Sequence, residues 1–182
     1  RSSFPKAFQK FMSAMLKDIL MGKDNQYIDD TLLTFKKSLP TLPVNVIAKG
    51  GAIKELSKYD NGSWTKGKAI AEFEKGTPAH VKAGIAYNRL LKFFNCPYKH
   101  EPIRDGDKVK WVYLKTNPLG LEGLAFKDYN DPKDIMDFIE TYIDREEIYK
   151  AELDNKLTDF YNALGWQMAS NETKKAQKFF AF

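Results

Sequence analysis

Histidine and cysteine are the side chains most often used for metal binding and nucleophilic chemistry, and this chain holds two histidines and one cysteine. His80 and His100 are twenty residues apart, and neither has a second ligand at metal-site spacing. Cys96 precedes a proline without an evident activating neighbour, which favours a structural thiol. No phosphate-binding loop of the GxxxxGK[ST] type occurs, and no pair of carboxylates is singled out by its context. These residues predict a binding module without catalytic or metal-binding residues.

Positive charge is concentrated in the first two thirds of the chain. Residues 1–115 hold 21 Lys and Arg against 11 Asp and Glu, whereas residues 116–182 hold 8 against 13. A basic field of this kind attracts polyanions, and nucleic acid is the commonest of them. The alternative is a solvated lysine surface that binds nothing.

Between Lys49 and Lys115 the basic residues are interleaved with aromatic residues and glycines. Lysines neutralise phosphates, glycines let backbone N–H groups approach them, and aromatic or Asn side chains stack on bases or reach groove edges. The combination predicts a nucleic-acid surface, although Trp111, on an alternating strand, is better explained by core packing. The predicted binding residues are Lys49, Lys54, Lys58, Tyr59, Lys66, Lys68, His80, Lys82, Tyr87, Asn88, Arg89 and Lys115.

Hydrophobic periodicity predicts the helices that would position these residues. Apolar side chains recur at spacings of three and four, as on one face of a helix. Near Asp144 the last helical region is expected to divide into two segments. Helices are expected over residues 5–21, 27–39, 78–94 and 131–166, with a short one at most over 52–58.

Two short stretches are expected as strands. VNVIA (44–48) is rich in β-branched residues. DKVKWVYLK (107–115) alternates between apolar residues and lysines, with turn residues before it and the loop NPLGLEG after it. The expected class is therefore α+β, mostly helical, with a small β element. No apolar run approaches the length of a membrane span, so no membrane partner is expected.

The last ten residues, TKKAQKFFAF, combine three lysines with Phe179, Phe180 and Phe182. Chain ends are usually frayed and wet, so exposed rings there have no obvious benefit. Either the rings fold back onto their own domain or a partner buries them. We expect a domain over residues 1–170 and a flexible tail over 171–182.

Five motifs, in order, resemble the carboxy-terminal thumb of family B replicative DNA polymerases from T-even-like tailed bacteriophages. The motifs are RSSFPKAFQKFM, NVIAKGGAIKELSKYDNG, HVKAGIAYNRLLK, GDKVKWVYLKTNPLG and KKAQKFFAF. The resemblance extends patchily over essentially all 182 residues. Its most specific parts are the S-S-x-P-K-A opening, the K-Y-D and Y-N-R elements and the aromatic end.

The resemblance implies a polymerase thumb-like helical domain that grips primer–template DNA. The duplex-binding segment of the family corresponds to Lys49, Lys54, Lys58 and Tyr59, together with the Tyr87–Arg89 element. The final peptide of such polymerases docks in a hydrophobic pocket of the sliding clamp. Gln177, Phe179, Phe180 and Phe182 occupy those positions here. The implied location is the cytoplasm of an infected bacterial host.

The polymerase regions upstream of the thumb are expected to be missing, because the chain begins at Arg1 near the palm–thumb junction of the family. Mg²⁺ is therefore expected only in the missing palm, no cofactor is expected in this chain, and the chain should be a nucleotidyltransferase fragment that is inactive alone. A palm-containing partner, from the same gene or a split one, is implied. Without it, an exposed apolar patch around Phe4, Phe8 and Phe11 is expected. The alternative functions are a stand-alone clamp-interacting adaptor or a small basic DNA-binding accessory protein.

Overall fold

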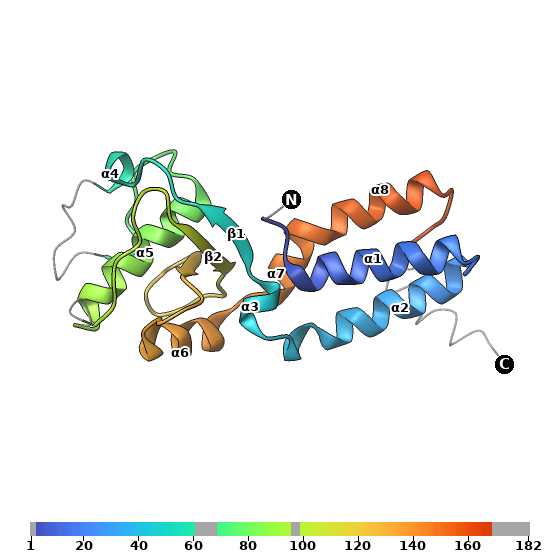
Figure 1. Cartoon of the computed structure of the whole chain (residues 1–182), viewed down its shortest axis with the longest axis horizontal. Helices are drawn as coiled ribbons and strands as arrows, with labels where there is room; N and C mark the ends of the chain where they lie inside the picture. The colour runs from blue at the N-terminus through green and yellow to red at the C-terminus, as the bar shows by residue number, and fades with distance from the viewer. Residues whose placement is uncertain (1–2, 61–68, 96–98, 169–182) are drawn as a thin grey trace.

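The chain folds into two lobes that lie side by side (Figure 1). This computed structural model describes residues 3–60, 69–95 and 99–168. One lobe is a bundle of helices from the two ends of the described chain, and the other is a small sheet with helices around it. The expected mostly helical α+β class is confirmed. The tail expected over 171–182 lies outside the described residues.

A helical hairpin opens the bundle. Helix α1 (Lys6–Leu20) and helix α2 (Asn25–Ser38) lie close to the ranges predicted from periodicity. Gly22 adopts a φ of +82° between them, a left-handed conformation that glycine adopts without steric cost. Asp24 then caps α2, because its carboxylate accepts the Tyr27 N–H at 2.9 Å.

Aromatic rings fill the base of this bundle. Phe8 is fully buried, and its ring centroid lies 5.9 Å from Phe35 and 6.2 Å from Tyr149. Phe11 stacks on Phe35 at 4.2 Å and is also buried. The expected apolar patch around Phe4, Phe8 and Phe11 is therefore wrong: α2 and the later helix carrying Tyr149 cover Phe8 and Phe11, and Phe4 is half-buried.

The chain between the bundle and the sheet turns sharply. A 3₁₀ turn, η1 (Leu39–Thr41), follows α2, and a short helix, α3 (Val44–Ile47), comes next. The strand predicted for VNVIA is wrong, because Pro43 starts a helical turn that buries both Val44 and Ile47. The first strand, β1 (Lys49–Ala52), begins two residues later, and α4 (Leu56–Tyr59) follows it.

The sheet has three antiparallel strands in the order β1-β2-β3. Strand β2 (Lys108–Tyr113) lies in the middle, and the DKVKWVYLK prediction is confirmed. Strand β3 (Gly123–Phe126) is not among the predicted elements, and its first residue, Gly123, falls in the predicted loop NPLGLEG. Asn117 makes it possible: its side-chain oxygen accepts the N–H groups of Leu119 and Leu121 at 3.2 Å and turns the chain back onto β2.

Helix α5 (Ala79–Phe93) packs across the sheet, principally on β3. The apolar residues Val81, Ile85 and Leu91, whose spacing predicts this helix, are buried. Gly84 allows the close approach of the preceding segment, because a Cβ there would lie 3.1 Å from Ile53 Cδ1.

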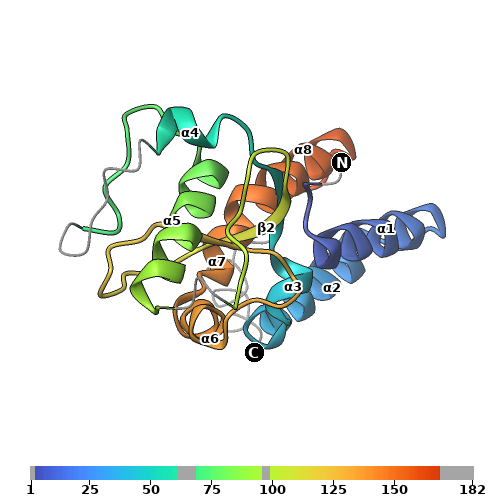
Figure 2. The ribbon, with the colours of Figure 1, turned by 60° about the vertical axis from the view of Figure 1, so that its left-hand side comes forward.

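The last part of the described chain runs through both lobes. Helix α6 (Lys133–Tyr142) ends just before Asp144, which caps α7 (Arg145–Tyr149) by accepting the Glu147 N–H at 2.9 Å. The predicted division near Asp144 is confirmed. A π-helical turn, η2 (Lys150–Asp154), leads into α8 (Asn155–Ala163), which returns to the bundle beside α1 (Figures 1 and 2). No helix in the described ranges is long and apolar enough to cross a membrane.

Backbone contacts join the two lobes where β2 ends. Leu114 forms an isolated antiparallel bridge with Ile143. The Lys115 N–H donates to Tyr142 O at 2.7 Å, and the Asp144 N–H donates to Tyr113 O at 2.9 Å. These bonds place the end of β2 against the α6–α7 junction, although the two segments are about thirty residues apart in sequence.

Candidate nucleic-acid interface

Lys54 and Lys58 are exposed on the segment that carries α4. The segment is anchored to the sheet lobe, because the Leu56 N–H donates to Asp105 Oδ1 at 2.6 Å. Lys58 Nζ lies 3.3 Å from Glu55 Oε2 and 5.2 Å from the centroid of the Tyr59 ring. Glu55 raises the pKa of Lys58 above its ordinary value, so the ammonium stays charged. Of the predicted residues, these two lysines are well placed to contact a phosphate backbone.

Lys49 is instead held inside the fold. Its Nζ forms an ion pair with Glu152 Oε1 at 2.7 Å and donates to the Tyr113 hydroxyl at 3.2 Å. It also lies 4.4 Å from the Trp111 ring centroid, and its side chain is 14% exposed. Trp111 is buried, as core packing predicts. Since Glu152 belongs to η2, Lys49 connects the sheet to the long helical segment, and little of its charge faces solvent.

His80 and Lys82 lie at the start of α5, next to the sheet. Gly51 lets His80 approach β1 closely, because a Cβ on residue 51 would lie 3.3 Å from His80 Cβ. Burial, with the nearby Lys49 charge, lowers the pKa of His80 below its ordinary value, so the neutral ring is favoured near pH 7. Lys82 Nζ lies 3.7 Å from Glu122 Oε2, and this pair is largely exposed.

The Tyr87–Asn88–Arg89 element faces inward. Tyr87 is fully buried. Asn88 bonds the backbone of Ile103 in both directions, at 2.8 and 2.7 Å. Arg89 is 7% exposed and donates to Ile70 O at 2.9 Å and Glu72 O at 2.5 Å, with Asp60 Oδ1 at 3.4 Å. The burial of Tyr87 and the internal partners of Asn88 and Arg89 disfavour direct DNA contacts from these three side chains, whose role here is to stabilise the fold.

Arg89 also explains the K-Y-D element. Its guanidinium bridges Asp60 to the backbone of Ile70 and Glu72, so it ties α4 to the segment that precedes α5. Lys66 and Lys68 lie outside the described residues, as do the predicted clamp-binding residues Gln177, Phe179, Phe180 and Phe182.

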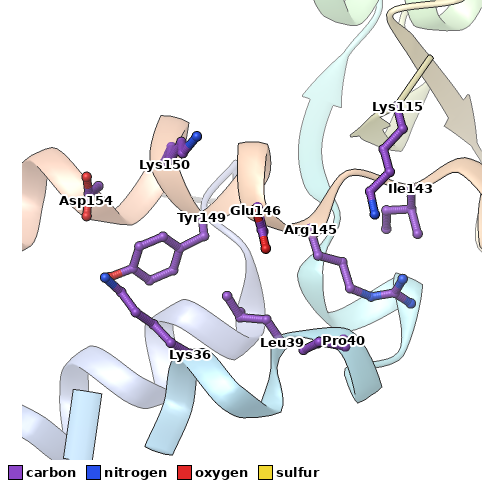
Figure 3. A pocket seen from close by; sticks show the side chains of 10 residues that line it. All are labelled: Lys36, Leu39, Pro40, Lys115, Ile143, Arg145, Glu146, Tyr149, Lys150 and Asp154. Atoms are coloured by element: carbon purple, nitrogen blue, oxygen red, sulfur yellow. The ribbon is translucent and has the colours of Figure 1, made fainter. Parts of the chain in front are cut away.

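Lys115 lies in a cleft between the lobes, among residues that are far from it in sequence (Figure 3). The cleft has a volume of about 430 Å³, and its walls come from the end of α2, η1, the chain two residues past β2 and the segment around α7. Lys36, Lys115, Arg145 and Lys150 are its cations, and Glu146 and Asp154 are its carboxylates. Tyr149 lies along one wall with Lys36 beside it, the Lys36 Nζ being 4.8 Å from the ring centroid.

Sequence reasoning missed Lys36, Arg145 and Lys150. They are basic residues on helical segments outside the region from Lys49 to Lys115, and Arg145 and Lys150 belong to the acidic third of the chain. Their meeting with Lys115 depends on the bridge between Leu114 and Ile143 and on Arg145, whose guanidinium donates to Leu42 O at 3.2 and 3.1 Å. No local pattern in the sequence signals such a meeting.

Across the described ranges, no group of three or more His, Cys, Asp or Glu side chains is arranged to hold a metal ion. A scan against protein-family models finds no match to this chain. A search of curated proteins likewise finds no significant match.

Proposed function

We propose that the chain is the thumb region of a viral family B DNA polymerase, which grips primer–template DNA and tethers the polymerase to a sliding clamp. The proposal depends on one principal observation: five motifs resembling that region follow in the same order along essentially the whole chain. Catalysis is assigned to a palm-containing partner that supplies the Mg²⁺ site. Alone, the chain binds DNA and clamp but does not synthesise DNA.

The exposed lysines of the α4 segment support the DNA part of the proposal. Lys54 and Lys58 carry charge into solvent from a segment that Asp105 and Arg89 hold in place, through Leu56 and Asp60 respectively. Cations fixed in this way neutralise phosphates without reading sequence, which suits a duplex that must slide past the protein. Lys49 is held by Glu152 and the neutral ring is favoured at His80, so neither adds much positive charge to this surface.

The clamp part depends on sequence alone. Gln177 followed by Phe179, Phe180 and Phe182 is a short peptide with closely spaced apolar anchors. Bound to a clamp that encircles DNA, such a peptide raises the effective concentration of the thumb at the primer end. The tether and the duplex grip would therefore act together although each is weak.

Salt-dependent binding to a duplex with a recessed 3′ end tests the DNA part. Fluorescence anisotropy with the full chain should show affinity falling steeply as salt rises. Lys54→Gln and Lys58→Gln should each reduce the slope of log affinity against log salt by about 1. Lys133→Gln is the charge-matched control, because Lys133 is exposed on α6 and lies outside the proposed surface. Binding that does not change with salt would refute the phosphate grip.

Deleting the last four residues separates the polymerase thumb from the alternative adaptor. The thumb proposal predicts unchanged duplex affinity and lost clamp binding. An adaptor would lose clamp binding too, but would bind little DNA with or without its tail. A basic accessory protein would bind DNA and show no clamp binding in either form.

A further inference from the structure

The interlobe cleft has the composition of an anion site, and the proposed duplex surface does not account for it. We propose that the cleft binds a phosphate group through Lys36, Lys115 and Lys150, with the Tyr149 hydroxyl as a neutral donor. Only Lys115 belongs to the predicted nucleic-acid residues. The cleft volume of about 430 Å³ falls within the usual range for sites that enclose small ligands.

The three lysines are available for a ligand. Among the described residues, no carboxylate lies within ion-pair distance of Lys36, Lys115 or Lys150. Lys36 is half-buried, whereas Lys115 and Lys150 are exposed. A partly buried cation without a counter-ion is electrostatically unfavourable, and a phosphate oxygen beside the Lys36 ammonium would relieve that cost.

Tyr149 supplies an independent observation. Its side chain is 5% exposed, and its hydroxyl is buried without a hydrogen-bond partner in the described structure. Leaving a buried polar group unbonded costs free energy, so such a group points to a missing water or ligand. Burial and the nearby Asp154 charge raise the pKa of Tyr149, so the hydroxyl stays protonated and can donate a hydrogen bond to an anion.

The walls of the cleft are held by bonds that do not use these groups. Arg145 fixes η1 against α7 through Leu42 O and also reaches Glu140 Oε2 at 3.3 Å. The Lys115 backbone N–H is bonded to Tyr142 O. Lys36 reaches from α2 to the Tyr149 ring, whereas Lys115 extends from the other wall of the cleft towards Ile143 and Arg145 (Figure 3).

Two carboxylates, Glu146 and Asp154, share the lining. The net charge of the lining is therefore only slightly positive. Long-range electrostatic attraction to polyanions is a poor explanation for binding at such a site. An anion would be retained by direct contacts with the lysines and the tyrosine hydroxyl, and these contacts make the site testable one side chain at a time.

Inorganic pyrophosphate is the probe. Titration of the full chain, followed by NMR signals of the lysine ammonium groups and by calorimetry, should show saturable binding. Lys36→Gln and Lys150→Gln should each weaken it by about tenfold, the loss expected for one charge-assisted hydrogen bond. Lys37→Gln is the matched control, since Lys37 is the exposed neighbour of Lys36 on α2 and does not line the cleft.

Tyr149→Phe keeps the ring that packs on Phe8 and removes only the hydroxyl. It should weaken pyrophosphate binding by about fivefold while leaving the protein folded, because the lost donor has no internal partner. Unsaturable binding, or equal losses from Lys36→Gln and Lys37→Gln, would overturn the proposal.

Competition with DNA identifies the source of the phosphate. If the source is a DNA backbone, a labelled oligonucleotide is displaced by pyrophosphate and bound more weakly by Lys36→Gln and Lys150→Gln. If the source is a free phosphorylated molecule, DNA affinity does not change in these variants. Both results support phosphate binding in the cleft. Neither result depends on Lys54 or Lys58. Failure of the proposed duplex grip can therefore be distinguished from failure of this site.

Discussion

The basic residues of the sheet lobe and those of the interlobe cleft differ in what their charges do. In the sheet lobe, Lys49 and Arg89 are paired with carboxylates and surrounded by backbone acceptors or rings. In the cleft, Lys115 and Lys150 have no such pair among the described residues. Lys49 and Arg89 therefore stabilise the fold, whereas Lys115 and Lys150 remain free to bind.

A basic residue can bind a ligand only if its charge is not already engaged in a contact within the fold. The sequence between Lys49 and Lys115 is rich in cations, but the fold uses several of them as internal connections. The acidic third of the chain contributes Arg145 and Lys150 to the more open cation cluster. A binding surface must therefore be judged by which cations are exposed to solvent and not held by buried partners.

The largest effect is expected from Arg89→Met. The substitution leaves Asp60 and the Ile70 and Glu72 carbonyls without their shared donor, and should reduce the free energy of unfolding by about 3 kcal/mol. Urea denaturation followed by circular dichroism measures it. Arg104→Met is the control, because Arg104 is exposed and should change stability little. If Arg89→Met weakened only DNA binding, the internal assignment of Arg89 would be wrong.

Lys49→Met should cost about 2 kcal/mol of unfolding free energy, since it leaves the largely buried Glu152 carboxylate unpaired. Glu152→Gln in the same background should recover part of that loss. A double-mutant cycle on unfolding free energies measures this coupling. Additive losses would mean that the ion pair does not connect the lobes energetically.

His80 should titrate below its ordinary pKa in the folded protein. As pH falls below about 6.5, the unfolded chain takes up the proton first, so stability decreases until the lower folded pKa is passed. Proton NMR of the His80 ring measures the folded value. Lys49→Met should raise that pKa by removing a positive charge, yet leave it below the ordinary value because burial is the larger cause. No change in this variant would contradict the electrostatic contact.

The smallest effect on stability is expected in the cleft. Lys115→Gln and Lys150→Gln should each change the unfolding free energy by less than about 0.5 kcal/mol, because neither ammonium has an internal ion pair to lose. Urea denaturation beside Lys49→Met gives the direct comparison between the two regions. A loss as large as that of Lys49→Met would show that the cleft lysines also support the fold.

Much of the fold follows from local pattern. The first two helices, α5, the central strand and the division at Asp144 were all predictable from apolar spacing and cap residues. The helix at Val44–Ile47 and strand β3 were not, because four-residue elements have too little periodicity to decide between a strand, a helix and a loop. Their conformations depend on Pro43 and on the turn that Asn117 organises.

The sequence by itself determined the fold class, the positions of the long helices and the segregation of charge along the chain. These properties depend on residue type and short spacing, which are local. Only the tertiary structure decided which cations are available, because pairs such as Lys49 with Glu152 and Arg145 with Leu42 join residues about a hundred positions apart. The interlobe cleft depends on the same long-range contacts, so its lysines meet only in the folded chain.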